Sequence, residues 1–133
     1  MDRKTGSDLP LKGLRILVVE DEFLIASAIE DTLQEAGADT VRAASVPCAL
    51  KDIDYKAPSA ALLDVRLGSQ TTRDVADCLA ARDIPFLFYS GDGLPDEMRD
   101  RHPDAELLLK PVTPLAIIEA VRKIAARRKN HRL

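Results

Sequence analysis

Residues 16–22 read ILVVEDE, an apolar run that ends in three consecutive acids. Two further runs have a similar form: residues 60–64 read AALLD, and residues 85–90 read PFLFYS. Short continuous runs of aliphatic and aromatic residues are typical of strands that are buried on both faces. Strands of that kind occur in parallel sheets covered by helices, so these three runs predict an α/β fold.

The segments between these runs have helical periodicity. Apolar residues recur on one helical face at Leu24, Ala28, Ile29 and Leu33, at Val75, Cys78 and Leu79, and at Leu115, Ile118, Val121 and Ile124. Ser45 and Thr113 are suitable N-caps, and a short helix is expected near residues 96–101. With two weaker strands at 40–44 and 106–109, five strands alternate with about five helices. This order predicts a parallel sheet with helices on both faces.

The composition fits a single globular domain. The 133 residues are 46% hydrophobic and 31% charged, which allows one core in a soluble protein. We expect a polar tail over residues 1–12, the domain over 13–128 and a basic tail over 129–133. Cys48 and Cys78 have no metal-binding spacing and are expected in the core.

Charge and hydropathy exclude two classes of partner. The net charge of −3 offers no general basic surface for nucleic acid. No apolar run is long enough to span a bilayer, and the first residues do not have the pattern of a secretory leader. A cytoplasmic protein that contacts neither nucleic acid nor membrane is therefore expected.

A polar side chain follows almost every expected strand. Glu20 and Asp21 follow the first, Asp64 ends the third, Ser90 ends the fourth and Lys110 follows the fifth. In a parallel sheet these ends lie at one edge, where ligands of open α/β sheets bind. We therefore expect three or four carboxylates, one hydroxyl and one ammonium to meet in a shallow pocket.

This set of groups suits phosphoryl transfer. Clustered carboxylates repel one another unless a cation lies among them, and oxygen ligands of this kind suit Mg²⁺. Asp64 is a lone carboxylate and can act as a nucleophile, whereas the adjacent Glu20 and Asp21 are suited to share the cation. The Lys110 ammonium can neutralise the charge of one phosphoryl oxygen, and the Ser90 hydroxyl can donate a hydrogen bond to another.

The motifs LVVEDE at 17–22, LLDVRLG at 62–68, FYSG at 88–91 and LLKP at 108–111 resemble those of the response-regulator receiver domain. The resemblance covers roughly residues 13–128. It implies a flavodoxin-like sheet of five parallel strands in the order 2-1-3-4-5, with helices on both faces.

The resemblance also implies a role for each site residue. Asp64 matches the phosphoacceptor. Asp21 matches a direct Mg²⁺ ligand, Glu20 a ligand acting through water, and Arg66 a residue whose backbone carbonyl binds the metal. Ser90 matches the switch hydroxyl and Lys110 the phosphate-binding lysine, and a cis peptide is expected between Lys110 and Pro111.

The sequence departs from the family pattern at two positions. Leu107 stands where the family often has a Tyr or Phe that acts as a rotamer switch, and Gly91 replaces the common alanine after the hydroxyl. Residues 85–91, PFLFYSG, are similar to the PFxFATGY motif of the receiver subgroup called "FAT GUY", with Tyr89 in place of its alanine. That subgroup contains many single-domain receivers.

The resemblance implies a single-domain response regulator of a two-component phosphorelay, and not an enzyme with a small-molecule substrate. A histidine kinase or a histidine phosphotransfer protein would phosphorylate Asp64 with Mg²⁺ bound. A downstream protein would then bind the face formed by the fourth helix, fifth strand and fifth helix.

Three other functions use similar features. An aspartyl-phosphate phosphatase needs the same acidic residues, Ser90 and Lys110, but usually has a second Asp where Arg66 stands. A phosphorylation-independent module with this fold would not need the complete set of charged groups. Flavin binding is disfavoured because the acids at 20–22 stand where a flavin phosphate would need donors.

Overall fold

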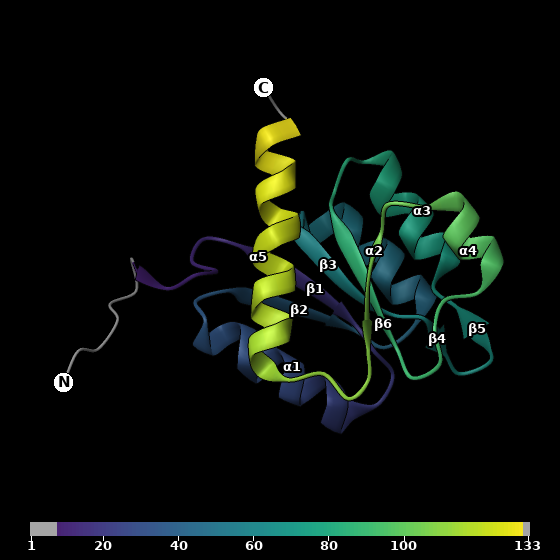
Figure 1. The fold of residues 1–133 in the computed structure, drawn as a ribbon, viewed down its shortest axis with the longest axis horizontal. Coiled ribbons are helices and arrows are strands. Elements are labelled where there is room, and N and C mark those ends of the chain that lie inside the picture. Colours follow the sequence, from purple (N-terminus) through teal and green to yellow (C-terminus); the bar gives the residue numbers. More distant parts are fainter. Residues whose placement is uncertain (1–7, 132–133) are drawn as a thin grey trace.

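The computed structural model describes residues 8–131, with side chains as far as residue 127 (Figure 1). Its main element is a five-stranded parallel sheet in the order β2-β1-β3-β6-β7. The order 2-1-3-4-5 predicted for the five sheet strands is thereby confirmed. These strands are β1 (Arg15–Val19), β2 (Asp39–Ala43), β3 (Ala60–Asp64), β6 (Phe86–Ser90) and β7 (Glu106–Leu109).

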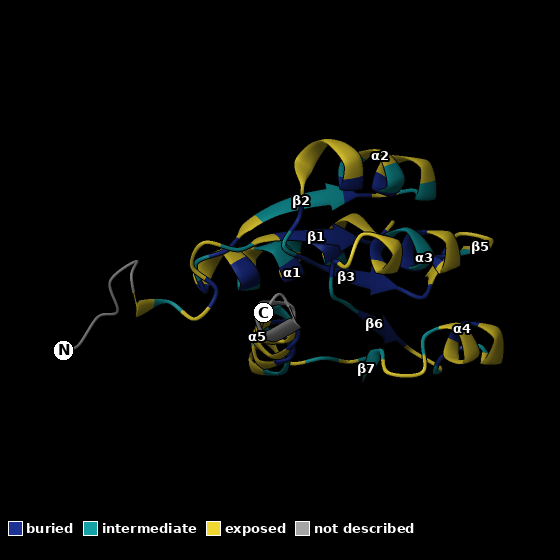
Figure 2. Cartoon of the chain, turned by 90° about the horizontal axis from the view of Figure 1, so that it is seen from above, coloured by how far each residue is buried: buried dark blue, intermediate teal, exposed yellow. Residues whose placement is uncertain are grey.

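Helices cover both faces of this sheet (Figures 1 and 2). The helices α1 and α5 pack on one face, and α2, α3 and α4 pack on the other. Their bounds are α1 (Phe23–Glu35), α2 (Val46–Lys56), α3 (Arg73–Ala81), α4 (Asp96–Arg101) and α5 (Pro114–His131). Among residues 8–131, no helix is long and apolar enough to cross a membrane.

Alternation along the central strands builds two cores. In β1, Leu17 and Val19 join the core under α2 and α3, while Ile16 and Val18 join the core under α1 and α5. All four side chains are fully buried. Because successive side chains of a strand point to opposite faces, a continuous apolar run is what a sheet covered on both sides requires.

The register of the sheet aligns the carboxyl ends of its strands. Val19 lies opposite Leu63 of β3, and Ser90 of β6 lies opposite Leu109 of β7. Beyond the paired residues, the Glu20 N–H donates to the Ala43 carbonyl at 3.0 Å, and the Lys110 N–H donates to the Ser90 carbonyl at 2.7 Å. The polar residues that follow these strands are therefore fixed at one edge of the sheet.

A small hairpin that the sequence did not predict follows β3. Strands β4 (Arg66–Leu67) and β5 (Gln70–Thr71) pair antiparallel between β3 and α3, where no strand was predicted. Gly68 in its turn has a φ of 60°, in the left-handed region that glycine adopts without strain. The hairpin places the backbone of Gly68 close to the carboxyl edge of the main sheet.

Several local predictions are confirmed. The short helix expected near residues 96–101 is α4. The Ser45 hydroxyl accepts the Cys48 N–H at 3.2 Å, and the Thr113 hydroxyl accepts the Ala116 N–H at the same distance. Both hydroxyls cap the N-terminal end of a helix as expected.

The predicted helix faces need correction at their ends. In α1 the buried residues are Ala26, Ile29 and Leu33, whereas Leu24 is 79% exposed and Ala28 is also exposed. Leu24 and Ala28 instead line an open groove between α1 and the segment that leads into α5.

The predicted inward face of α5 also needs correction in its first turn. Leu115 is 69% exposed, and the buried positions are Ile117, Ala120, Val121 and Ile124. Ile118, expected on the inward face, is only partly buried.

The expected core position of the two cysteines is wrong for one of them. Cys48 is exposed and Cys78 is partly buried, and both are free thiols. Cys48 lies in the first turn of α2, on the side turned away from the sheet, where the helix buries Ala49 and Ile53 instead.

Ordered structure is present on both sides of residues 13–128, the range expected for the domain. Leu11 is fully buried, and its N–H donates to the Ala36 carbonyl at 2.8 Å. The segment expected as a polar tail therefore packs on α1 from at least this residue onward. The helix α5 continues to His131, into the expected basic tail. Residues 1–7 and 132–133 lie outside the described residues.

These burial differences along α1 predict unequal effects of two leucine truncations. Leu33→Ala is expected to lower the free energy of unfolding by about 2–4 kcal/mol, because it opens a cavity in the core. Leu24→Ala removes the same atoms from an exposed side chain and is expected to change the free energy of unfolding by less than about 0.5 kcal/mol. Urea denaturation measures both, and equal losses would contradict the described orientation of α1.

Candidate functional site

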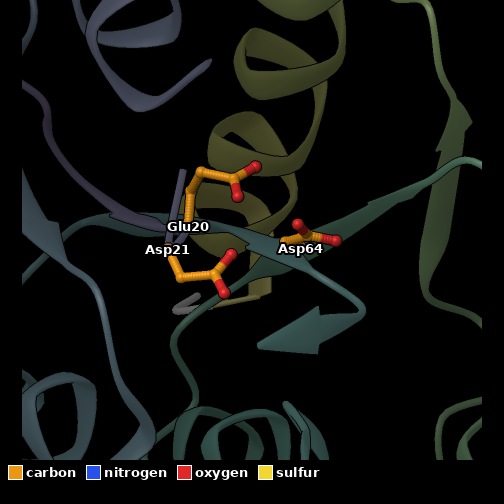
Figure 3. A group of neighbouring side chains, drawn as sticks. All are labelled: Glu20, Asp21 and Asp64. Carbon is orange, nitrogen blue, oxygen red and sulfur yellow. The ribbon is translucent and has the colours of Figure 1, made fainter. Parts of the chain in front are cut away.

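The structure brings the predicted acidic residues together at the carboxyl edge of the sheet (Figure 3). Each of three residues contributes one carboxylate oxygen to a group of atoms that lie within 4.8 Å of one another: Glu20, Asp21 and Asp64. Asp21 and Asp64 line an open pocket of about 330 Å³, together with Glu22, Arg66, Gly68, Ser90, Gly91, Asp92 and Lys110. Glu20 is almost fully buried beneath this pocket.

Asp64 lies at the end of the central strand β3 and opens into the pocket. Its Oδ2 atom is 3.3 Å from the Lys110 ammonium, and its Oδ1 atom accepts the Arg66 N–H at 3.4 Å. The backbone carbonyl of Asp64 accepts the hydroxyl of the fully buried Thr72 at 2.8 Å. Backbone and side chain of Asp64 are therefore both held, with one face of the carboxylate toward the pocket.

Glu20 is held by hydrogen bonds at both oxygens. The Tyr89 hydroxyl donates to Oε1 at 2.7 Å, and the Glu22 N–H donates to Oε2 at 3.0 Å. The Lys110 ammonium lies 3.8 Å from Oε1. Burial raises the pKa of the Glu20 carboxyl to about 6, although the hydrogen bonds act in the opposite direction.

Asp21 is exposed and is anchored by the small hairpin. The Gly68 N–H, in the turn between β4 and β5, donates to Asp21 Oδ2 at 3.0 Å. This contact joins two loops that are 47 residues apart in the chain. The hairpin therefore fixes the direction of the most solvent-accessible carboxylate of the cluster.

Ser90 ends β6 and forms a local turn with Asp92. Its hydroxyl donates to Asp92 Oδ1 at 3.2 Å and accepts the Asp92 N–H at the same distance. Lys110 follows β7, and the Lys110–Pro111 peptide bond, expected to be cis, is cis. All the predicted side-chain groups thus border one pocket or lie directly beneath it.

The donor set fits a hard divalent cation. Three carboxylates face one nearby ammonium, which leaves an excess of negative charge at the pocket. Mg²⁺ prefers oxygen ligands and keeps several waters, so an open pocket with two or three carboxylates suits it. Asp21 and Asp64 would hold the ion directly and Glu20 from below; the Arg66 carbonyl as a ligand stays a prediction.

Sequence reasoning missed three residues that support this site. Tyr89 binds Glu20, Thr72 binds the Asp64 backbone, and Gly68 binds Asp21. Only Tyr89 had a detectable signal, because a tyrosine in a buried strand needs a partner for its hydroxyl. The Gly68 and Thr72 contacts depend on the unpredicted hairpin and its return to α3.

The fold and this arrangement of strand ends define a class: the chain has the fold of response regulator receiver domains. It is similar to the CheY-like receiver domain protein from Methanospirillum hungatei JF-1, with a TM-score of 0.80 and 20% identity over 91% of this chain and 98% of that one. It is also similar to the chemotaxis protein CheY4 from Vibrio cholerae, with a TM-score of 0.75 and 20% identity over 84% and 98% of the two chains.

A longer protein contains the same fold. NtrX from Brucella abortus matches with a TM-score of 0.78 and 25% identity, over 90% of this chain and 28% of that one. No family model matches the sequence, and no curated protein matches it significantly.

The raised pKa of Glu20 predicts a pH-dependent effect of Glu20→Gln in the metal-free protein. A carboxyl with a higher pKa in the folded than in the unfolded state stabilises the fold while protonated and loses that contribution as pH rises through about 6. The variant, which cannot ionise, is therefore expected to gain stability over the wild type at about pH 8 and much less at about pH 5.

Urea denaturation with a chelator at both pH values measures this difference. The same change at the exposed Glu35 controls for loss of a surface charge. A Glu20→Gln effect that is equal at both pH values would contradict a burial-raised pKa.

Proposed function

We propose that this protein is a response regulator that accepts a phosphoryl group on Asp64 from a histidine kinase or a histidine phosphotransfer protein. The observation that carries the proposal is the position of Asp64. Its carboxylate faces an open pocket, with the Lys110 ammonium at 3.3 Å and the other two carboxylates beside it. A nucleophile, a charge-neutralising cation and a metal-binding set are thus combined within one site.

In the proposed reaction an oxygen of Asp64 attacks the phosphorus of a phosphorylated histidine. The new O–P bond forms as the N–P bond breaks, and the leaving imidazole takes up a proton. A bound Mg²⁺ would neutralise charge on the phosphoryl oxygens. Lys110 contributes a second positive charge there, and its salt bridge to Asp64 keeps it in place before transfer.

Ser90 is proposed to respond to the phosphoryl group. Before transfer its hydroxyl is paired with the Asp92 carboxylate. A phosphoryl group on Asp64 offers a more strongly charged acceptor in the same pocket, so the hydroxyl would turn toward it and release the turn at residues 90–92. This movement would alter the face formed by α4, β7 and α5, which binds the downstream protein.

A groove beside the site suits the phosphodonor protein. It has a volume of about 590 Å³ and lies between α1 and the segment from β7 to α5, with Leu24, Ile25 and Ala28 on one side and Pro111 and Val112 on the other. Lys110 lines both the groove and the phosphoacceptor pocket. A helical donor lying in this apolar groove would bring its histidine next to Asp64.

The proposal does not include turnover of a small-molecule substrate. Asp64 would form a phosphorylated state, and a phosphatase of the aspartyl-phosphate type would need a general acid where Arg66 stands. Arg66 has no carboxyl group and cannot take the place of the aspartate that usually fills that role. The proposal also places the protein in the cytoplasm, where kinases that use ATP phosphorylate their partners.

Replacing the proposed acceptor tests the function directly. Asp64→Asn keeps the size of the side chain but replaces the nucleophilic carboxylate by an uncharged amide. Mg²⁺-dependent phosphorylation by acetyl phosphate is therefore expected to be abolished. Mass spectrometry of the intact protein measures the added phosphoryl group. Asp39→Asn, exposed at the amino end of β2, is the control. Phosphorylation of the Asp64 variant at the wild-type level would refute Asp64 as acceptor.

The groove predicts a variant that separates donor binding from chemistry. Leu24→Asp places a charge in the groove, so transfer from the cognate histidine kinase, found by profiling the kinases of the source organism, is expected to slow by at least about tenfold. Phosphorylation by acetyl phosphate, which needs no docking, is expected to stay unchanged.

Leu109→Asp is the matched control, because Leu109 is similarly exposed on β7 but does not line the groove. Equal slowing by both leucine variants, or slowing with acetyl phosphate, would argue against the groove as the docking surface.

A further inference from the structure

Tyr89 contacts two of the charged groups that surround Asp64. It lies in β6, immediately before Ser90, and only 2% of it is exposed. Its hydroxyl donates to Glu20 at 2.7 Å, and the Lys110 ammonium lies 4.9 Å from the centre of its ring. Tyr89 has no role in the reaction proposed above, although it contacts both the Glu20 carboxylate and the Lys110 ammonium.

The hydroxyl end of Tyr89 fixes a carboxylate. Glu20 Oε1 accepts a hydrogen bond from the Tyr89 hydroxyl at 2.7 Å and forms an ion pair with the Lys110 ammonium at 3.8 Å. Burial and the nearby carboxylates raise the pKa of Tyr89, so the hydroxyl keeps its proton and acts as a donor. Without this donor only the Glu22 N–H would hold the Glu20 carboxylate, and its Oε1 atom could move closer to Lys110 and draw the ammonium away from Asp64.

The ring end of Tyr89 supports the ammonium. A cation within about 6 Å of an aromatic ring centre is attracted to the face of the ring, most strongly where water is excluded. The buried ring lies beside Lys110 and offers this attraction next to Asp64. One side chain thus contacts both the buried acidic group and the basic group that lie next to Asp64.

We propose that Tyr89 is a positioning residue for phosphoryl acceptance: its hydroxyl orients Glu20 for the metal ion, and its ring holds Lys110 beside Asp64. This proposal rests on the proposed function, since it assigns tasks to Glu20 and Lys110 in that reaction. The two contacts use different parts of the side chain and can therefore be removed one at a time.

Tyr89→Phe removes the hydroxyl and keeps the ring. Partners that hydrogen-bond to ligating carboxylates typically contribute 10- to 100-fold to metal affinity, so Mg²⁺ binding measured by calorimetry is expected to weaken by roughly tenfold. The Mg²⁺ concentration for half-maximal phosphorylation by acetyl phosphate should rise by a similar factor. The rate at saturating Mg²⁺ is expected to change by less than about twofold, because the ring still supports Lys110.

Tyr89→Leu removes both contacts. It is expected to weaken Mg²⁺ binding as Tyr89→Phe does, and in addition to lower the phosphorylation rate at saturating Mg²⁺ several-fold. Tyr55→Phe is the matched control, because Tyr55 is 77% exposed on α2 and does not line the pocket. A merely structural role for Tyr89 would lower the folded fraction but would leave the half-maximal Mg²⁺ concentration where it is.

The outcomes separate this inference from the proposed function. A Tyr89→Phe protein that binds Mg²⁺ as tightly as the wild type overturns the positioning role, even if Asp64 is phosphorylated normally. A wild type that is not phosphorylated overturns the proposed function, while the calorimetric comparison still decides the role of the Tyr89 hydroxyl. A wild type that binds no Mg²⁺ overturns both.

Discussion

A single ammonium group, that of Lys110, faces the carboxylates of Glu20 and Asp64 at the carboxyl edge of the sheet. Among the side chains described, the ion pairs of this cluster are both made by Lys110. Like charges held this close repel one another unless they are balanced, and one ammonium does not balance three carboxylates. The remaining negative charge suits the pocket to a divalent cation, which the proposed phosphoryl transfer requires.

The strand ends that meet at this pocket could be predicted from the sequence, because a parallel sheet leaves few alternatives. The apolar runs at residues 16–19, 60–63 and 86–89 predict buried strands, and the alignment of their carboxyl ends follows from the topology of a parallel sheet. The structure has Asp64, Ser90 and the acidic pair where this reasoning places them. The class of fold was therefore predictable from the apolar runs and the helical periodicity between them, and the strand order from the family resemblance. Most of the side chains at the site were predictable from the residues that end each run.

What could not be predicted depends on contacts outside the regular pattern. The hairpin that brings Gly68 to Asp21 consists of two-residue strands, too short for any periodicity to appear. The exposure of Leu24 and Leu115 depends on where α1 and α5 lie relative to the sheet and to each other, which apolar spacing does not report. In both cases the missing information is a distance in space between elements, not a property of either segment.

Tyr89 and Leu107 together suggest where the coupling between site and surface lies. The family often has its aromatic residue at the position of Leu107, on β7, whereas here the buried aromatic residue beside the site is Tyr89, on the neighbouring strand β6. Tyr89 and Lys110 also line the groove between α1 and α5, so the same two side chains border the surface proposed for the donor and the charges around Asp64. A protein lying in that groove would contact the two residues proposed to position the groups around Asp64, so the proposed docking surface and the proposed reaction site share one buried ring.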